Sequence, residues 1–290
     1  MLRIYALRDF SDVMEGDMGG LIDKEANLSH IGNAWVYKNA KVYGDAEVYK
    51  NAKVRGDAEV FGAARVCDNA EVSGYAHVCG NAEVSDNARV SGDAWVYGNV
   101  EVSDNARVSD NARVRGNARV SGDAEVSDNA RVYDNAEVSD NARVCGNAEV
   151  SGNARVYGDA HVFDDAHVSD TAEVSDKAWV FDNARVSGDA RVNDNAWVSG
   201  KARVSGVAWV HGTADVGGTA EVSDNADYIV FKNWWSSGRY LTWTRSNDMW
   251  KVGCFYGTGA ELVKKAYQDS EVSGREYERI VNYVKSIINQ

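Results

Sequence analysis

The side chains that could perform chemistry gather in the last quarter of the chain. Cys254 is a candidate nucleophile, but every histidine lies before residue 212, so none is close in sequence to activate the thiol. Cys254 also alternates with Trp250 and Val252, which places all three on one face of a strand. We therefore expect a buried structural thiol and predict no catalytic residue.

Anion binding is the second chemistry that this region could perform. Arg239, Arg245 and Lys251 are interleaved with tryptophans at positions 235, 243 and 250. Cationic side chains among indoles can clamp an anion or stack a base. We predict Arg239, Trp243 and Arg245 as binding residues for a small anionic ligand or nucleotide. The alternative is that the tryptophans form the core of a small module.

A six-residue repeat dominates the chain before this region. Every sixth residue from Ala34 to Ala226 is Ala, except Val100, and every sixth residue from Val36 to Val222 is Val. The unit is Ala-x-Val-y-[Gly/Asp]-[Asn/Asp]. Ala and Val lie two apart and face the same side of a strand, while Gly, Asp and Asn tolerate the left-handed backbone of a corner. We predict a four-residue strand and a two-residue corner per unit.

Such a unit is one side of a polygon and is incompatible with a helix, because six residues drift on a period of 3.6. The pattern resembles the hexapeptide-repeat proteins, which form left-handed parallel β-helices of three hexads per coil. The resemblance implies an all-β solenoid of about eleven triangular 18-residue coils over residues 34–226. At about 4.8 Å per coil the rod is roughly 50 Å long. The absence of proline suits a ladder that uses every amide.

Residues 18 apart stack in columns on the outside of such a solenoid. One column, from Glu47 to Arg191, nearly alternates in sign and predicts a ladder of ion pairs. Another region brings Phe163, Trp179, Phe181 and Trp197 together beside a histidine at position 161. Exposed aromatic clusters mark interaction sites, so we predict these four as binding residues. Because the patch lies near the end of the rod, where the tail follows, docking of the tail on it is the favoured interpretation, and an outside protein partner is the alternative.

Acyl transfer and cation binding are two further chemistries that the repeat could support. Many hexapeptide-repeat proteins are acyltransferases with a loop leaving a coil and a histidine set against a neighbouring subunit. This chain has no loop, and its repeat histidines (His77, His161, His167 and His211) occupy regular outward slots. Stacked corner carboxylates such as Asp68, Asp86 and Asp104 could hold cations, but Asp in turns ordinarily accepts from backbone amides. We predict no metal or cofactor, and the transferase stays an alternative.

Both ends of the solenoid need caps against strand addition. Residues 1–33 resemble the leader of uncharacterised phage and bacterial members of the family, with RDF, GG and EANLS before the first coil; we predict a cap with a tight turn at Gly19-Gly20.

Residues 227–290 predict an α+β module: strands YIVFK, YLTWTR and MWKVGCF, then two helices after capping boxes Thr258–Glu261 and Ser273–Glu276. An apolar stripe marks the second helix: Tyr277, Ile280, Val281, Val284 and Ile288. The tail is similar to a small module on repeat proteins of phage and gut bacteria, through its SSGR, GCF and GT elements.

Charge limits the partners of the whole chain. The net charge is −13, yet residues 227–290 carry nine Lys or Arg and seven Asp or Glu, so the body before them is strongly acidic. Such a body repels duplex nucleic acid. No apolar run is long enough for a membrane span, and four cysteines without metal-type spacing suit free thiols in the cytoplasm. We predict a noncatalytic, phage-associated rod that displays or spaces its tail module, of undetermined oligomeric state.

Overall fold

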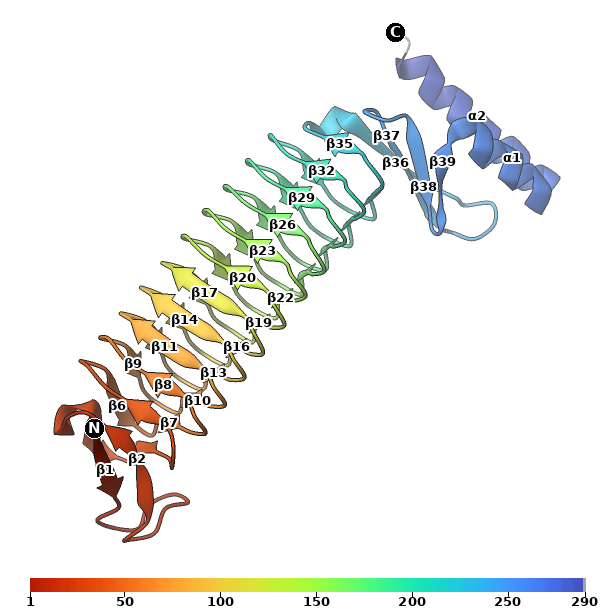
Figure 1. Ribbon diagram of the computed structural model, residues 1–290. Coiled ribbons are helices and arrows are strands. Elements are labelled where there is room, and N and C mark those ends of the chain that lie inside the picture. Colours follow the sequence, from red (N-terminus) through yellow and green to blue (C-terminus); the bar gives the residue numbers. More distant parts are fainter. Residues whose placement is uncertain (289–290) are drawn as a thin grey trace.

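The hexads form the three sides of a parallel β-solenoid, and the remaining residues close its two ends (Figure 1). The computed structural model describes residues 1–288. One sheet has 13 strands and the other two have 11 each. Within the repeat, partners on successive coils are 18 residues apart, as in the pairing of Val114 with Val132. The predicted solenoid is thus confirmed.

The 13-stranded sheet runs the length of the rod from the N-terminal cap to the last coil. In spatial order its strands are β1 (Leu2–Tyr5), β2 (Met18–Ile22), β5 (Lys41–Val42), β8 (Glu59–Val60), β11 (His77–Gly80), β14 (Trp95–Gly98), β17 (Arg113–Gly116), β20 (Arg131–Val132), β23 (Glu149–Val150), β26 (His167–Val168), β29 (Arg185–Val186), β32 (Arg203–Val204) and β35 (Glu221–Val222).

The other two sheets form the remaining sides. The second contains β4 (Trp35–Val36), β7 (Lys53–Val54), β10 (Glu71–Val72), β13 (Arg89–Val90), β16 (Arg107–Val108), β19 (Glu125–Val126), β22 (Arg143–Val144), β25 (His161–Val162), β28 (Trp179–Val180), β31 (Trp197–Val198) and β34 (Asp215–Val216). The third contains β3 (Leu28–Gly32), β6 (Glu47–Lys50), β9 (Arg65–Val66), β12 (Glu83–Val84), β15 (Glu101–Val102), β18 (Arg119–Val120), β21 (Glu137–Val138), β24 (Arg155–Val156), β27 (Glu173–Val174), β30 (Arg191–Val192) and β33 (Trp209–Val210).

Alanine and valine fill the interior of the rod. The repeat positions from Val36 to Val222 are buried almost completely, including Val100 in an alanine slot. Ala226, the last alanine of the pattern, is exposed because the chain has left the solenoid in the short 3-10 helix η2 (Asn225–Asp227). The interior is therefore one continuous apolar column with no space for a buried site.

The corners are longer than predicted and the strands are shorter. Most strands contain only x and Val, because the amide of the next Ala turns back to the carbonyl of y, as Ala106 does to Ser103 at 3.2 Å. The first corner slot has positive φ, 59° at Asp104 for example. The Asp104 carboxylate accepts from the amide of Gly122 on the next coil at 3.0 Å. Corner aspartates therefore bond backbone amides, as the sequence suggested.

Outward side chains form ladders along the rod. The predicted ion-pair column is confirmed at three steps, one of which joins Arg119 to Glu101 at 3.4 Å. A second kind of ladder, which the repeat pattern did not predict, is formed by corner asparagines, whose side-chain amides donate to the residue 18 positions later. One such asparagine ladder runs through Asn33, Asn51, Asn69, Asn87 and Asn105 and ends on Asp123.

The N-terminal cap supplies donors to the first coil. The amides of the x, y and second corner residues donate to the coil that follows, as Lys41 does to Ala58 at 2.9 Å, so the first coil is left with outward carbonyls. The buried side-chain amide of Asn27, at the end of η1 (Glu25–Asn27), donates to the carbonyls of Gly44 and Ala46 at 3.0 and 2.8 Å. The predicted cap therefore acts through hydrogen bonds that continue the ladder.

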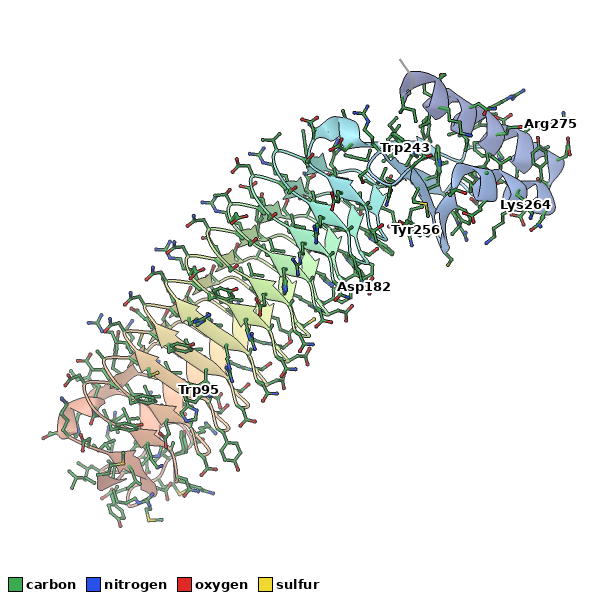
Figure 2. The ribbon with its side chains drawn as sticks, turned by 45° about the horizontal axis from the view of Figure 1, so that its top comes forward. Trp95, Asp182, Trp243, Tyr256, Lys264 and Arg275 are labelled. Carbon is green, nitrogen blue, oxygen red and sulfur yellow. The ribbon has the colours of Figure 1, made fainter. Side chains whose placement is uncertain are left out.

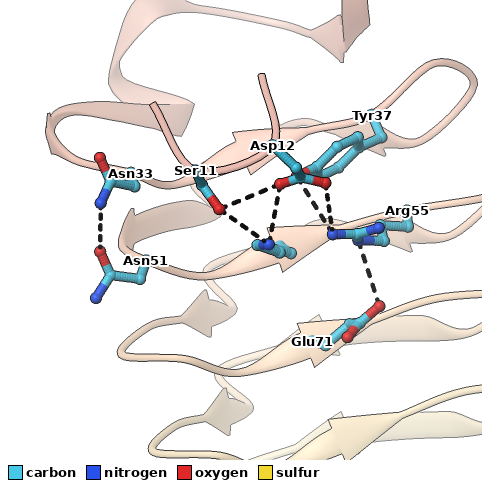
Figure 3. A network of polar contacts seen from close by, with 8 residues as sticks. Ser11, Asp12, Asn33, Tyr37, Asn51, Arg55 and Glu71 are labelled. Atoms are coloured by element: carbon cyan, nitrogen blue, oxygen red, sulfur yellow. Dashed lines mark hydrogen bonds and ion pairs between the residues drawn. The ribbon is translucent and has the colours of Figure 1, made fainter. Parts of the chain in front are cut away.

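Two other features tie the cap to the coils. Asp12 accepts from the Tyr37 hydroxyl at 2.7 Å and pairs with Lys53 and Arg55 at 3.1 and 3.2 Å (Figure 3). These hydrogen bonds hold the pKa of Asp12 well below its ordinary value. The tight turn predicted at Gly19-Gly20 is wrong: both lie in β2, where a Cβ on Gly20 would stand 2.5 Å from Val36. Close packing, and not a turn, requires glycine there.

The C-terminal module is a four-stranded antiparallel sheet covered by two helices (Figure 1). Its elements are β36 (Tyr228–Lys232), β37 (Tyr240–Thr244), β38 (Met249–Val252), β39 (Phe255–Thr258), α1 (Gly259–Asp269) and α2 (Glu271–Ile288). Three strands were predicted; the third divides because Gly253 adopts a left-handed turn, with φ of 54°. No helix within residues 1–288 is long and apolar enough to cross a bilayer.

The two predicted helix starts have different outcomes. Thr258 and Glu261 form the predicted capping box of α1. The second box is wrong, because α2 begins two residues before Ser273, and Ser270 instead accepts from the amide of Ser273 at 3.1 Å. In the predicted apolar stripe of α2, Tyr277, Val281 and Val284 are buried. The other two members, Ile280 and Ile288, are not buried.

Candidate functional site

The aromatic patch predicted on the rod exists and is continuous. We use this name for Phe163, Trp179, Phe181 and Trp197 together with His161. Trp179 stacks on His161 and Trp197 at centroid distances of 5.2 and 5.4 Å, and Phe163 stacks on Phe181 at 5.1 Å. Burial and the nearby Arg143 lower the pKa of His161, which favours its neutral ring. The aromatic patch is thus an uncharged stripe along β25, β28 and β31.

The C-terminal module adjoins this patch at one end. β37 and β38 pack on β34, which follows Trp197 in the same sheet. A hollow of about 300 Å³ at the junction is lined by Trp197 and Asp215 of the rod and by Arg239 and Tyr240 of the module. Trp197 keeps 43% of its surface exposed. The module therefore sits on the end of the rod beside the patch, and docking over the patch is not what holds it.

Side-chain oxygens of the chain that follows hold the last coil. Six of its outward amides, which lack a further coil, each donate to such an oxygen. The pairs are Trp209 to Asn225, His211 to Tyr228, Asp215 to Thr242, Thr219 to Tyr256, Glu221 to Ser246 and Ser223 to Asp227, at 2.7 to 3.4 Å. Figure 2 shows Tyr256 at this junction. The module is thus also a cap, whose acceptors complement the donors at the other end.

One half-buried carboxylate lies at the junction, and its Oδ1 atom is inaccessible. Burial raises the pKa of Asp215 to about 6, and the positive charge of Lys251 opposes this rise. The Oδ1 atom of Asp215 has no hydrogen-bond partner within residues 1–288. When Asp215 is ionised, its unpaired charge therefore destabilises the contact between the module and the last coil.

Trp243 is not a binding residue, which corrects the sequence prediction. Its side chain is 1% exposed in the core of the module, and its Nε1 donates to Asp248 at 2.8 Å (Figure 2). Both faces of β37 are buried: Leu241 and Trp243 belong to the module core, whereas Thr242 meets the rod. The alternative considered for the tryptophans, a structural core, is confirmed at Trp243 and Trp250.

The two predicted arginines do not form one clamp. Arg239 and Arg245 are exposed and flank opposite ends of β37, a five-residue strand, so they lie roughly 20 Å apart along it. The guanidinium of Arg239 lies over Gly253 at the turn between β38 and β39. Only Arg239 therefore borders a concave surface.

That surface is a hollow of about 310 Å³, which we call the module hollow. Its walls are the loop between β36 and β37, the turn before β39, and one face of α1 with the start of α2. Arg239 and Lys265 contribute cations and Asp269 a carboxylate, while Val252 and Leu262 contribute apolar surface. The arrangement combines a few polar groups with an apolar wall, as small-molecule sites do.

Cys254 also lines the module hollow and is exposed, so the expectation of a buried thiol is wrong. The strand ends at Val252, and Cys254 occupies the turn instead of the strand face. The other cysteines are buried or partly buried on the rod, and all four are free thiols. Burial raises the pKa of the thiol of Cys67 to about 11.

The remaining sequence candidates are dispersed along the rod. His77 stacks on Trp95 of the next coil at 4.3 Å, whereas His211 lies against Trp209 at 4.7 Å, about seven coils away from His77. No three His, Cys, Asp or Glu side chains among residues 1–288 are grouped to hold a metal ion.

Sequence reasoning missed a second concave surface at the N-terminal end. A hollow of about 460 Å³ lies between β1 and β3 and is lined by apolar side chains including Leu2, Phe10 and Leu28. Leu7 and Ile31 nearby are 80% and 85% exposed. The apolar run LRIYAL was the available signal for it.

Comparison with known families agrees with the fold. Four segments of the chain match the family model described as YdcK beta solenoid repeat: residues 82–98, 106–122, 148–164 and 184–200. Each matched segment spans nearly one coil. A comparison with curated proteins gives no match. The fold and the matched repeats together make the chain a β-solenoid repeat protein.

Proposed function

We propose that this β-solenoid repeat protein is a noncatalytic spacer, which holds its C-terminal module at a fixed distance and orientation from its N-terminal cap. In this role the module is the recognition element and the rod determines where it is presented. A partner could contact the module itself or the adjoining aromatic patch.

The observation that carries the proposal is the attachment of the module to the last coil. A flexible linker would leave the last coil's amides to water, but six of them bond to side chains of the chain that follows. The helices α1 and α2 meanwhile lie on the side of the module sheet that faces away from the rod (Figure 1). Rigid attachment with the far face of the module free is what a spacer requires.

The rod itself supports a mechanical role. Its interior is filled, its strands pair without interruption from β2 to β35, and several of its outward charges pair between coils. Consecutive coils contact only their neighbours, so the length of the rod is proportional to the number of coils. Spacing is therefore the property that the repeat encodes most directly.

Spin-label distances test this proposal. One label is placed on the native Cys254 and another at position 30 in a His30→Cys variant, with the three other cysteines replaced by Ser, the commonest residue of their slot. We expect one narrow distance, which shortens by about 4.8 Å when residues 105–122, one coil, are deleted. A broad distribution, or one that ignores the deletion, contradicts a rigid spacer. Turnover of acetyl-CoA by the purified chain contradicts a noncatalytic one.

Capture of a small anionic ligand by the module is the second candidate function. The module hollow favours it, because Arg239 and Lys265 border a concave surface at the end of the chain that carries net positive charge. The two functions are compatible, since a spacer can present a binding module.

A further inference from the structure

The hydrogen bonds around Asn233 orient the hydroxyl groups of the module hollow. Asn233 is 2% exposed, and its Oδ1 accepts from the backbone amide of Ser236 at 3.0 Å. This contact fixes the side-chain amide, because a backbone N–H can only donate. The Nδ2 of Asn233 therefore faces the hydroxyls, at 3.3 Å from Ser237 and 3.0 Å from Tyr277.

The hydrogen bonds that these hydroxyls accept leave their own hydrogens free to donate. Ser237 Oγ accepts from Asn233 and also from the amide of Arg239 at 3.4 Å, which occupies both of its lone pairs. Tyr277 accepts from Asn233. The polar wall of the module hollow thus offers two hydroxyl hydrogens beside the cations of Arg239 and Lys265, and Asp269 adds one carboxylate.

The two cations have no acidic partner inside the protein. Within residues 1–288 neither Arg239 nor Lys265 forms an ion pair, and Lys265 is held over the ring of Phe255 at 5.6 Å. Burial raises the pKa of Tyr277, the hydrogen bond from Asn233 and the charge of Arg239 lower it, and Asp269 raises it. Arg239 and Asp269 therefore both face this hydroxyl, and the cations exceed the carboxylate by one.

The walls between these groups are apolar. Val252, Leu262 and Phe255 line the same hollow, and its volume of about 310 Å³ is at the small end of the range for ligand sites. A ligand that fits must therefore have one anionic group for the donors and a small apolar body for these walls.

We infer that the module hollow binds a small organic oxyanion, a carboxylate or a phosphate monoester, with Arg239, Lys265, Ser237 and Tyr277 as donors. This inference rests on the proposal that the module is the recognition end of the rod. The spin-label experiment concerns rigidity alone, so failure of binding and failure of the spacer are separate results.

The test uses the full chain and three probes that share a phenyl body: benzoate, phenyl phosphate and the neutral benzyl alcohol. Binding is followed by titration calorimetry and by chemical shifts of backbone amides. We expect saturable binding of at least one anion, with shifts concentrated at residues 237, 239 and 265, and no saturation with benzyl alcohol. Preference for phenyl phosphate or for benzoate identifies which oxyanion the site takes.

Arginine variants supply the matched control. Arg239→Gln removes a charged donor and should weaken binding by about ten- to a hundredfold. Arg245→Gln makes the same change on an exposed arginine at the other end of β37 and should leave the affinity unchanged. Ser237→Ala should weaken binding less than Arg239→Gln does. Equal losses of affinity in both arginine variants would overturn the inference. So would the absence of saturation by either anion at 10 mM, which is roughly a hundred times the concentration at which such a site would fill.

Discussion

The backbone amide of Asp215 in the last coil donates to Oγ1 of Thr242 in the module at 2.8 Å. At the opposite end, the Nδ2 of Asn27 donates to the carbonyls of Gly44 and Ala46. The two caps therefore carry opposite hydrogen-bonding character, because the last coil presents outward amides and the first coil presents outward carbonyls. Each cap satisfies the groups that its end of the rod exposes.

Thr242→Val should loosen the module without altering the rod. The substitution preserves shape but leaves the amide of Asp215 without an acceptor in a buried contact, which costs about 1 to 3 kcal/mol. Hydrogen exchange of the Asp215 amide should accelerate accordingly. Thr219→Val, on an exposed side chain of the same coil, is the control and should leave that amide protected. Equal exchange in both variants would show that Thr242 does not hold the module.

Asn27→Asp should open the first coil. The carboxylate has no hydrogen to donate, and its charge would face two carbonyl oxygens in a buried position, so we expect a loss of about 2 to 5 kcal/mol. Limited proteolysis should then cut within residues 20–50 before the rest of the rod. Asn183→Asp makes the same change on an exposed corner and should leave cleavage unaltered. Resistance of the Asn27 variant would remove this residue from the cap.

Val114→Asp should disrupt the middle of the rod. Val114 is fully buried in β17, and burying a carboxylate among valines costs several kcal/mol. The melting temperature measured by circular dichroism should fall sharply. Arg113→Asp places the same residue one position earlier on the exposed side of the strand, and its effect should be small. A matching fall in both variants would contradict the alternation of inside and outside.

Stability at the junction should decrease as the pH rises from about 4 to 6. The pKa of Asp215 is 3.8 when unfolded and about 6 in the folded protein, so the folded state binds the proton more tightly. The stability gained from this proton is complete below about pH 4 and is lost as the pH rises through about 6. Since one pKa unit corresponds to about 1.36 kcal/mol, the loss is at most about 3 kcal/mol. Hydrogen exchange at Glu221 and Thr242 across pH 4 to 7, corrected for intrinsic rates, measures it. Asp215→Asn should remove the dependence and stabilise docking at pH 7.

The rod could be predicted from sequence because its environment repeats. Each valine from Val36 to Val222 meets the same neighbours, so one hexad specifies the burial of all the others. The column of ion pairs followed from the 18-residue stacking. The strand length could not be predicted from the sequence, because alternating inward and outward side chains do not show that the amide of Ala106 turns back to the carbonyl of Ser103.

The module was harder to predict because its strands face two partners. The interleaving of tryptophans with cations predicted Trp243 as a ligand residue, but Thr242 contacts the rod while Trp243 belongs to the core that β37 shares with the helices. Cys254 was misplaced because a left-handed Gly253 ends the strand first. The polar wall of the module hollow joins loop residues to α1 and α2, which are distant in sequence, so no local pattern could indicate it.

The asparagine ladders have consequences for the ageing of the protein. Each link runs from Nδ2 of one residue to Oδ1 of the residue 18 later, and the ladder that starts at Asn33 ends on Asp123, which needs only to accept. Spontaneous deamidation converts asparagine to aspartate and so removes a donor. Loss of the amide at Asn69 would cut this ladder in two, whereas deamidation at Asn105 would shorten it by one link. Chemical damage to these corners therefore has an effect that depends on the coil in which it occurs.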